Sequence, residues 1–561
     1  MTALWMGAGG TEDVIVLRRA GTILHISSLP SPYGIGTMGQ DAYDFVDFLK
    51  EAGLRYWQVL PLVPAGSGNS PYASYSTFAG NPDLIDLDFL QAVGLLERKE
   101  LTGQSWGKNP ARVDFDAVHR GKLPLLEKAY TRLTALGQAS FRPENLAPMP
   151  EKTLAAAKES SGKEKPSGKG KETLPSQSQT VTFTVTPPTL SLAAMQQFRL
   201  QHADWVEDYA LYMAVKERNE DKPWYQWPED IAQRQPQAVA YWSSEVKARM
   251  DFWVFVQYLF FTQWEALKFY ANERDVEIIG DLPIYVLHDS VDVWVNRKYF
   301  WLNRDNSLAK VAGVPPDAFS DMGQRWGNPL YRWDLLEDDG FGWWIHRIRR
   351  NAQIYDWVRI DHFRGFDQFY AIDRDEPDAR HGEWCEGPGY ALFQQIEKEL
   401  GRVKILAEDL GVITPSVRRL LRETGFPGMK VLQFACSGPD NAYLPHNCEE
   451  NAFLYTGTHD NDTAAGWVQN GDPKEVAFAK RYFGLNAEEG YHWGLIRGAL
   501  GSRCVVAMAQ MQDFLGLGSE HRMNVPATPS GNWGFRMVKG ASNDALAEKI
   551  RELLYCFGRL G

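Results

Sequence analysis

Four acidic residues stand at the ends of short apolar runs in the second half of the chain. Asp281 ends the run IIGD, Asp361 ends VRID and Glu408 ends ILAE, while Asp460 ends the longer segment FLYTGTHD. Each run has the length of a buried strand in a parallel sheet. The acids therefore stand where such strands would leave the core.

A set of carboxylates of this kind suits the cleavage of a glycosidic bond. One ionised carboxylate attacks the sugar, and one carboxylic acid protonates the departing oxygen. No cysteine or histidine spacing typical of a metal site accompanies the four acids, and we expect neither a metal nor a cofactor.

Acids from distant parts of a sequence converge in a (β/α)8 barrel, because catalytic residues come from the C-terminal ends of several strands. The first part of the chain fits this architecture. Residues 21–26 and 56–62 have the pattern of strands, and residues 43–52 between them have helical apolar spacing. Strand, helix and strand in this order form the unit of a parallel sheet. The sequence predicts an α/β fold of the TIM-barrel type.

The rest of the chain divides into helical stretches and one low-complexity segment. Residues 204–212 and 251–270 are aromatic-rich and predict helices, the second leading into the strand that ends at Asp281. Residues 142–191 hold a Lys/Ser/Pro-rich excursion with too few large apolar side chains to offset the entropy of ordering, so we expect it to be flexible. Within it, the alternation at 180–185 would suit an edge strand. We expect an N-terminal arm at 1–18 and the catalytic barrel at 19–561.

Composition excludes several classes of protein. A net charge of −12 over 561 residues argues against binding to nucleic acid or to an anionic membrane. No run is long enough to span a membrane, no targeting signal opens the chain, and five cysteines without a tight framework indicate reduced thiols. We expect a cytoplasmic protein. The 20 tryptophans and 23 tyrosines could stack on sugar rings, although most should fill the core.

Seven motifs carry a resemblance to a known family. They are a glycine-rich loop at 34–39, NSPY at 69–72 with FAGNP at 78–82, GDLPIYV at 280–286, RIDHFRGF at 359–366, AEDLG at 407–411, GTHDNDT at 457–463 and RMNVP at 522–526. In these motifs and their order the chain resembles the 4-α-glucanotransferases called amylomaltases or disproportionating enzymes, glycoside hydrolase family 77 of the α-amylase clan.

The resemblance implies a fold and a reaction. The fold would be a (β/α)8 barrel with subdomains inserted in its loops and no C-terminal β-sandwich domain. The reaction would move α-1,4-glucan segments from a donor malto-oligosaccharide to the 4-hydroxyl of an acceptor, with retention of the anomeric configuration. The implied partners are malto-oligosaccharides, starch- or glycogen-derived glucans, and glucose as an acceptor. The oligomeric state stays open.

The resemblance also assigns roles to the acids. Asp361 matches the nucleophile, Glu408 the general acid/base, and Asp460 the acid that holds the 2- and 3-hydroxyls of the sugar, with His459 donating to a hydroxyl beside it. Arg359 lies two residues before Asp361 on a strand, so their side chains point to the same face, and we expect Arg359 to lower the pKa of Asp361. The surroundings of Glu408 should compensate its charge less.

Further positions match residues that line the donor and acceptor subsites of the family; they are Ser70, Tyr72, Trp294, His362 and Asn532. Tyr72 and Trp294 could equally be packing residues. Asp281 could contact sugar or could orient Arg359.

Other residues depart from the family pattern or fit no site. Cys436 and Ser437 stand where the family usually has an aromatic residue and an acid, so the resemblance does not extend to any subsite hydrogen bond that this acid would supply. His25 and His288 fit no metal-ligand spacing, and we expect neighbouring backbone groups to satisfy them.

Two other functions remain open on the sequence alone. A hydrolytic α-glucosidase or α-amylase would use the same three acids with water as the acceptor. A glucan-binding scaffold would be expected to have lost at least one of them, yet all three are present.

Overall fold

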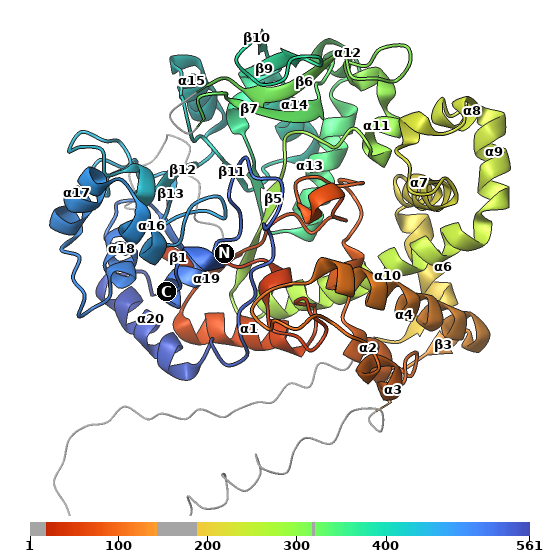
Figure 1. The fold of residues 1–561 in the computed structure, drawn as a ribbon, viewed down its shortest axis with the longest axis horizontal. Coiled ribbons are helices and arrows are strands. Elements are labelled where there is room, and N and C mark those ends of the chain that lie inside the picture. Colours follow the sequence, from red (N-terminus) through yellow and green to blue (C-terminus); the bar gives the residue numbers. More distant parts are fainter. Residues whose placement is uncertain (1–17, 143–187, 317–319, 561) are drawn as a thin grey trace, which may run out of the picture.

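The computed structural model describes residues 18–142, 188–316 and 320–560, and at its centre lies a closed barrel of eight parallel strands (Figure 1). The order of strands around the barrel is β1 (Arg19–Ile23), β14 (Val506–Gln510), β13 (Ala452–Tyr455), β12 (Gly428–Val431), β11 (Ile405–Ala407), β8 (Trp357–Ile360), β5 (Glu277–Leu282) and β2 (Tyr56–Gln58). Because β1 pairs with both β14 and β2, the sheet has no open edge. The predicted (β/α)8 barrel is confirmed.

The interior of the barrel is a separate apolar cluster contributed by alternate residues of the strands. Its members are Ile23, Tyr56, Ile279, Trp357, Leu406, Met429, Val431, Phe453, Tyr455, Val506 and Met508. The opposite faces of the strands pack on the surrounding helices, so these strands are buried on both sides and appear in the sequence as continuous apolar runs.

Helices cover the outside of the barrel. They include α1 (Gln40–Ala52), α10 (Lys247–Asn272), α13 (Gly342–Ile354), α14 (Gly389–Leu400), α15 (Pro415–Thr424), α16 (Ala464–Asn470), α17 (Pro473–Phe483), α18 (Tyr491–Leu500), α19 (Met511–Phe514) and α20 (Asp544–Cys556). Helix α20 packs against α1 and so joins the two ends of the described chain. Within the described residues β14 is the last strand, and no β-sandwich follows it.

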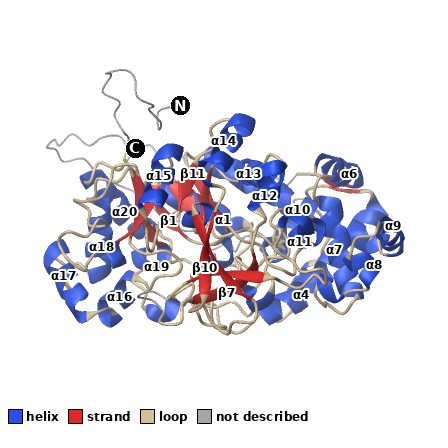
Figure 2. Cartoon of the chain, turned by 90° about the horizontal axis from the view of Figure 1, so that it is seen from above, coloured by secondary structure: helices blue, strands red, loops and turns tan. Residues whose placement is uncertain are grey.

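A helical subdomain is inserted between β2 and β5. It contains α2 (Leu87–Ala92), α3 (Arg98–Thr102), α4 (Phe115–Leu136), α6 (Leu192–Gln201), α7 (Val206–Arg218), α8 (Glu229–Ala232) and α9 (Pro236–Glu245), with the short pair β3 (Gln138–Ala139) and β4 (Leu190–Ser191). Figure 2 shows most of these helices at one end of the elongated molecule, opposite α16, α17 and α18.

A second insertion is a four-stranded antiparallel sheet built from the loops after β5 and β8. Its order is β10 (Gly382–Glu386), β9 (Gln368–Asp373), β6 (Lys310–Val314) and β7 (Gln324–Pro329). Two short helices, α11 (Val291–Val295) and α12 (Trp333–Asp338), flank β6 and β7 in the sequence. The inserted subdomains predicted from the resemblance are thus present.

The predicted elements agree with the structure except at their boundaries. The helices expected at 204–212 and 251–270 correspond to α7 and α10. The strand expected at 56–62 ends at Gln58, ahead of Pro61, which has no N–H to donate to a ladder. The arm at 1–17, the excursion at 143–187 and its strand at 180–185 lie outside the described residues. In the described ranges no helix is long and apolar enough to cross a membrane.

Candidate active site

The acids singled out in the sequence meet at the C-terminal ends of the barrel strands. Asp361 directly follows β8, Glu408 directly follows β11, and Asp281 is the penultimate residue of β5. These three strands are neighbours in the barrel, and β13, whose following loop carries Asp460, lies two strands beyond β11. Residues separated by up to 179 positions in the sequence, from Asp281 to Asp460, therefore lie at one rim.

Arg359 is the cation that these acids share. One amino group, Nη1, donates to both oxygens of Asp281 at 2.7 Å. The other, Nη2, lies 3.0 Å from Oδ1 of Asp361 and 4.0 Å from Oε2 of Glu408. Although burial disfavours a charged guanidinium, Asp281 and Asp361 keep the pKa of Arg359 above its ordinary value. One positive charge thus faces three carboxyl groups, too few to hold all three ionised.

Burial and this shortage of positive charge raise the pKa values of both Asp361 and Glu408. Burial raises the pKa of Asp361 to about 6, opposed by Arg359 and supported by Asp281. Burial also raises the pKa of Glu408 to about 8, again opposed by Arg359 and supported by Asp361. Arg359 lowers the pKa of Asp361, as expected, but desolvation outweighs this attraction and the net shift is upward. The expectation that Glu408 is the less compensated acid is confirmed.

The chain just after Asp361 wraps around Glu408. The backbone N–H of His362 donates to Oε2 of Glu408 at 2.6 Å, and that of Phe363 donates to the main-chain carbonyl of Glu408 at 3.1 Å. His362 reaches this position with φ of 53°. A left-handed conformation in a residue other than glycine costs about 1 kcal/mol or more, which is typical of functional sites. Burial lowers the pKa of the His362 imidazole to about 3, so the ring is neutral.

Asp460 is the most open of the acids, with 44% of its side chain exposed. Asn524 donates to its Oδ1 at 2.6 Å, and Arg522 donates to its main-chain carbonyl at 2.9 Å. Nε2 of His459 lies 3.4 Å from its Oδ2. Asn524 and Arg522 belong to the motif at 522–526, so the resemblance was a signal for them, although neither was assigned to the site.

Tyr72, which is half-buried, and the fully buried Asp281 lie next to the acids and contact each other. The Tyr72 hydroxyl donates to Oδ2 of Asp281 at 2.7 Å, and its ring stacks on that of His459 with centroids 5.1 Å apart. The Asp281 side chain has no exposed surface. Of the two alternatives for Asp281, contact with a sugar is therefore contradicted, and orientation of Arg359 and Tyr72 fits.

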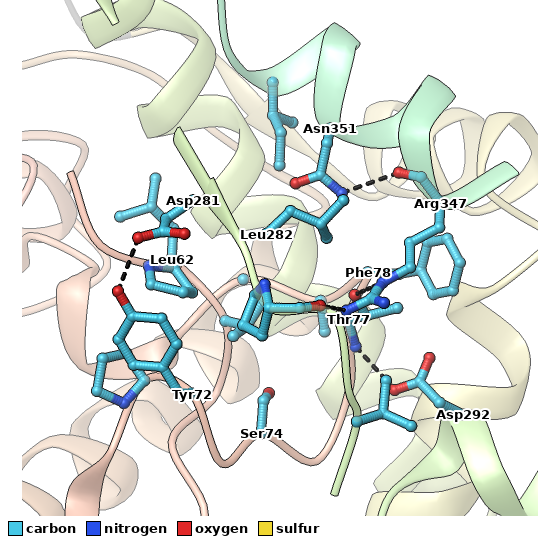
Figure 3. Close-up of a pocket in the computed structure, with 18 of the residues that line it drawn as sticks. Leu62, Tyr72, Ser74, Thr77, Phe78, Asp281, Leu282, Asp292, Arg347 and Asn351 are labelled. Carbon is cyan, nitrogen blue, oxygen red and sulfur yellow. Dashed lines mark hydrogen bonds between the residues drawn. The ribbon is translucent and has the colours of Figure 1, made fainter. Parts of the chain in front are cut away.

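Behind Tyr72 and Asp281 lies a small cavity of about 30 Å³ (Figure 3). Asp292, Arg347 and Asn351 line its other side, where Arg347 donates to Thr77 at 2.8 Å. Asp361, Glu408 and Asp460 are not among its lining residues. This volume has room for water but not for a sugar, since small-molecule sites span about 300 Å³ or more. The cavity is not the substrate site.

Three other sequence candidates have structural contacts of different kinds. Trp294 has no exposed surface, donates through its indole N–H to the carbonyl of Ile231 at 3.0 Å and packs under a guanidinium. The structure does not bring Trp294 to the site, and its packing alternative holds. The Ser70 hydroxyl accepts from the N–H of Tyr72 at 3.2 Å. Asn532 is bonded within its own loop, to Val525 at 3.0 Å.

The two isolated histidines differ. Nε2 of His288 is bonded to the carbonyl of Asn306 at 3.0 Å, as expected. Nδ1 of His25 is buried and has no hydrogen-bond partner among the described residues, so the expectation for His25 is wrong. Burial lowers the pKa of His25 to about 3, which leaves a neutral ring whose cost of burial is smaller than that of a charged one.

Two partly exposed tryptophans come from the inserted sheet. Trp326 on β7 is 37% exposed and packs edge-on against His362, with centroids 4.9 Å apart. Trp384 on β10 is 40% exposed and lies under the guanidinium of Arg364 at 4.1 Å. Trp326 was missed in the sequence, because nothing in a run of residues distinguishes a tryptophan beside the site from the many in the core.

Comparison with known proteins agrees with this geometry. Residues 24–147 and 179–541 match the family described as 4-alpha-glucanotransferase. The chain is 42% identical to the 4-alpha-glucanotransferase of Thermus thermophilus over 97% of this chain and 99% of the relative, and 41% identical to that of Clostridium butyricum over 96% and 100%. The amylomaltase from Streptococcus agalactiae, solved in complex with acarbose, superposes with a TM-score of 0.84 at 35% identity, covering 97% of this chain and 99% of that one. The chain belongs to the 4-α-glucanotransferases of glycoside hydrolase family 77.

Proposed function

We propose that the chain transfers α-1,4-glucan segments between malto-oligosaccharides by a double displacement, with Asp361 as the nucleophile and Glu408 as the acid and base. The observation that carries the proposal is the placement of Asp361 and Glu408 at the ends of neighbouring strands, where Nη2 of Arg359 lies 3.0 Å from the first carboxyl and 4.0 Å from the second. Because the guanidinium is closer to Asp361 and burial raises the pKa of Glu408, we assign the ionised state to Asp361 and the protonated state to Glu408. That is the starting state that a retaining mechanism requires.

In the first half of the reaction, the Asp361 carboxylate attacks the anomeric carbon of the donor. Glu408 gives its proton to the glycosidic oxygen, the bond between that oxygen and the anomeric carbon breaks, and the shortened glucan leaves. A covalent glycosyl–Asp361 intermediate forms. Because the negative charge of Asp361 is neutralised in this step, Arg359 is then left to Asp281 and Glu408.

In the second half, the acceptor glucan replaces the departed sugar. Ionised Glu408 takes the proton of the 4-hydroxyl, the hydroxyl oxygen attacks the anomeric carbon, and the bond to Asp361 breaks. Two inversions at one carbon give net retention. We assign Asp460 to the 2- and 3-hydroxyls of the reacting sugar, because its carboxylate is exposed and is fixed by Asn524.

Transfer rather than hydrolysis requires that a bound sugar hydroxyl outcompete water, which is present at about 55 M in bulk. An oriented group in a closed site gains an effective concentration far above that value. We assign Tyr72 and Trp326 to the walls of this site, since their rings pack on His459 and His362, the histidines next to Asp460 and Asp361 in the chain. His362, Ser70 and His459 complete the contacts near the reacting sugar, while Asn532 shapes its loop.

We also infer the organisation and location of the protein. The catalytic unit spans 19–561, with the subdomains inserted in its loops, and residues 1–18 precede it as an N-terminal arm. All five cysteines lie in the described ranges and are free thiols, which supports a reducing, cytoplasmic location.

The product distribution from maltotriose tests the function. A transferase yields glucose together with maltopentaose and longer oligomers, whereas a hydrolase yields only shorter sugars and a scaffold yields neither. Exclusive formation of glucose and maltose by the purified wild-type protein would overturn the proposal in favour of the hydrolytic alternative.

A further inference from the structure

Asp409, the residue after Glu408, closes a gap between two barrel strands. Strands β11 and β12 share one register pair, Ala407 with Gly428, and the N–H of Ala407 donates to the carbonyl of Pro427 at 2.9 Å. Beyond this pair, Oδ1 of Asp409 accepts the backbone N–H of Met429 at 2.7 Å. A side-chain carboxylate therefore links the two strands where a main-chain carbonyl would otherwise accept the hydrogen bond.

The second oxygen of the same carboxylate is held by a cation. Nζ of Lys430 donates to Oδ2 of Asp409 at 2.9 Å, and the two side chains are 11% and 6% exposed. The ammonium group also lies 5.3 Å from the centroid of the Tyr443 ring. Breaking a buried pair of this kind is strongly destabilising, because removal of either partner leaves the other charge buried without compensation.

Gly428 on β12, the strand next to β11, leaves space for the Asp409 carboxylate. A Cβ atom on Gly428 would lie 2.7 Å from Oδ1 of Asp409, inside van der Waals contact. The φ of Gly428 is not in the left-handed region. The glycine is therefore required by the proximity of Asp409 rather than by its own backbone conformation.

We propose that Asp409 is a positioning residue that fixes Glu408 for proton transfer, an inference that rests on the proposed role of Glu408. On the β8 side, the main chain of Glu408 is held by its N–H to the carbonyl of Ile360 and by its carbonyl to the N–H of Phe363, both at 3.1 Å. On the β12 side, Asp409 supplies the anchoring contact. Glu408 thus lies between two strands that hold its main chain. This restricts the positions its carboxyl group can occupy and reduces the entropy cost of reaching the glycosidic oxygen.

Asp409 also contributes charge to the site. The charged and titratable groups that act on Glu408 are Arg359, which lowers its pKa, and Asp361 and Asp409, which raise it. The phenol of Tyr443 and the imidazole of His362 are neutral at pH 7, because burial raises the pKa of the former and lowers that of the latter. Burial raises the pKa of Asp409 itself, and Lys430 opposes this shift. Loss of the Asp409 charge should therefore lower the pKa of Glu408.

The test is Asp409→Asn in the full chain. Its amide oxygen can still accept from Met429, but the negative charge is gone and Lys430 loses its partner. We expect kcat on maltotriose to fall about 10- to 100-fold with little change in KM, part of the 10²- to 10⁴-fold that proton transfer contributes. The alkaline limb of the pH–rate profile, which reports the ionisation of Glu408, should move to lower pH. On α-glucosyl fluoride, which needs little protonation to leave, the first step should fall much less.

Asp289→Asn is the matched control. Asp289 is a carboxylate in the helical side of the molecule that accepts from Nζ of Lys216 and from the hydroxyl of Tyr212, both at 2.6 Å. The same chemical change there should alter the melting temperature but leave the alkaline limb in place. If Asp409→Asn behaves like Asp289→Asn, with a changed melting temperature only, the inference is wrong.

Gly428→Ala provides a second variant, which keeps every charge and displaces the Asp409 carboxylate. It should lower kcat on maltotriose more than on α-glucosyl fluoride, and unchanged kcat for both folded variants also overturns the inference. Glu408→Gln, measured on the same two substrates, distinguishes a wrong role for Asp409 from a wrong assignment of Glu408 as the general acid. If Glu408→Gln is equally inactive on both, the assignment of Glu408 falls whatever Asp409 does.

Discussion

Nη2 of Arg359 lies 3.0 Å from Oδ1 of Asp361, yet the pKa of that carboxyl is raised, not lowered. The guanidinium is shared with Asp281, whose two oxygens it contacts at 2.7 Å. An arginine divided between carboxylates cannot fully offset the desolvation of each. This balance of charge supports the proposal that Asp361 is the ionised acid and Glu408 the protonated one.

Asp361→Asn should abolish transfer, because an amide has nearly the shape of the carboxylate but cannot attack the anomeric carbon. We expect the rate of maltotriose disproportionation to fall by about 10⁴-fold or more. Removal of a partly buried carboxylate with a raised pKa should not destabilise the protein at pH 8. Near-normal activity in a preparation free of host glucosidases would exclude Asp361 as the nucleophile.

The rate should depend on pH as a bell. Protonation of Asp361, with its pKa of about 6, limits the acid side, and ionisation of Glu408, with its pKa of about 8, limits the alkaline side. The two groups interact, so the measured limits belong to the pair. Glu408→Gln should remove the alkaline limb. The measurement is kcat/KM for α-glucosyl fluoride as a function of pH, from about 4 to 10. An alkaline limb that persists in this variant would assign it to another group.

The raised pKa of Glu408 should also make the stability of the protein depend on pH. The pKa of Glu408 is raised in the folded protein, from 4.5 to about 8, so the folded state binds the proton more tightly than the unfolded state does. The free energy of unfolding therefore falls as pH rises from about 4.5 through 8. Glu408→Gln removes this cost, and its melting temperature relative to wild type should rise with pH across this window. A difference independent of pH would contradict the raised pKa.

Tyr72→Ala should move the product balance from transfer towards hydrolysis. The ring stacks on His459 beside the acids, and without it water can reach the covalent intermediate. The measurement is the ratio of transferred glucosyl units to new reducing ends from maltotriose. Tyr72→Phe is the control, since it keeps the ring and loses only the hydrogen bond to Asp281. An unchanged ratio in Tyr72→Ala would remove this residue from the acceptor site.

Asn524→Ala should weaken the hold on Asp460. The lost bond, 2.6 Å from Nδ2 to Oδ1, joins a neutral donor to an exposed carboxylate, and such bonds contribute about 1.5–3 kcal/mol. We expect kcat/KM for maltotriose to fall about 10- to 100-fold with a small change in melting temperature. Asn532→Ala, in the same loop but bonded only within it, is the comparison, and equal losses in both variants would point to a general effect of the loop.

Replacement of residues 143–187 by a short Gly/Ser linker should leave the disproportionation rate and the melting temperature nearly unchanged. The segment is rich in Lys, Ser and Pro and contains none of the assigned acids, and the closure entropy of a loop grows only slowly with its length. Both quantities can be measured on one preparation. A large fall in either would show that the segment packs on the barrel.

The sequence by itself determined the barrel and the identity of its acids. Apolar runs of strand length ending in Asp281, Asp361 and Glu408 are a local pattern, because a strand buried on both faces must be continuously apolar and its polar end marks the rim. The ordered motifs identified the family for the same reason: each is a short, contiguous stretch whose meaning does not depend on distant residues.

Only the tertiary structure decided how those residues behave. The raised pKa of Asp361, the burial of Trp294 and the contact of Asn524 with Asp460 all depend on which distant segments meet, since desolvation and hydrogen bonding are set by neighbours in space. Arg359 illustrates the difference. Its spacing from Asp361 placed the two side chains on one face, but contact with Asp281, 78 residues earlier, was only one of two alternatives until the adjacency of β5 and β8 in the closed barrel decided it.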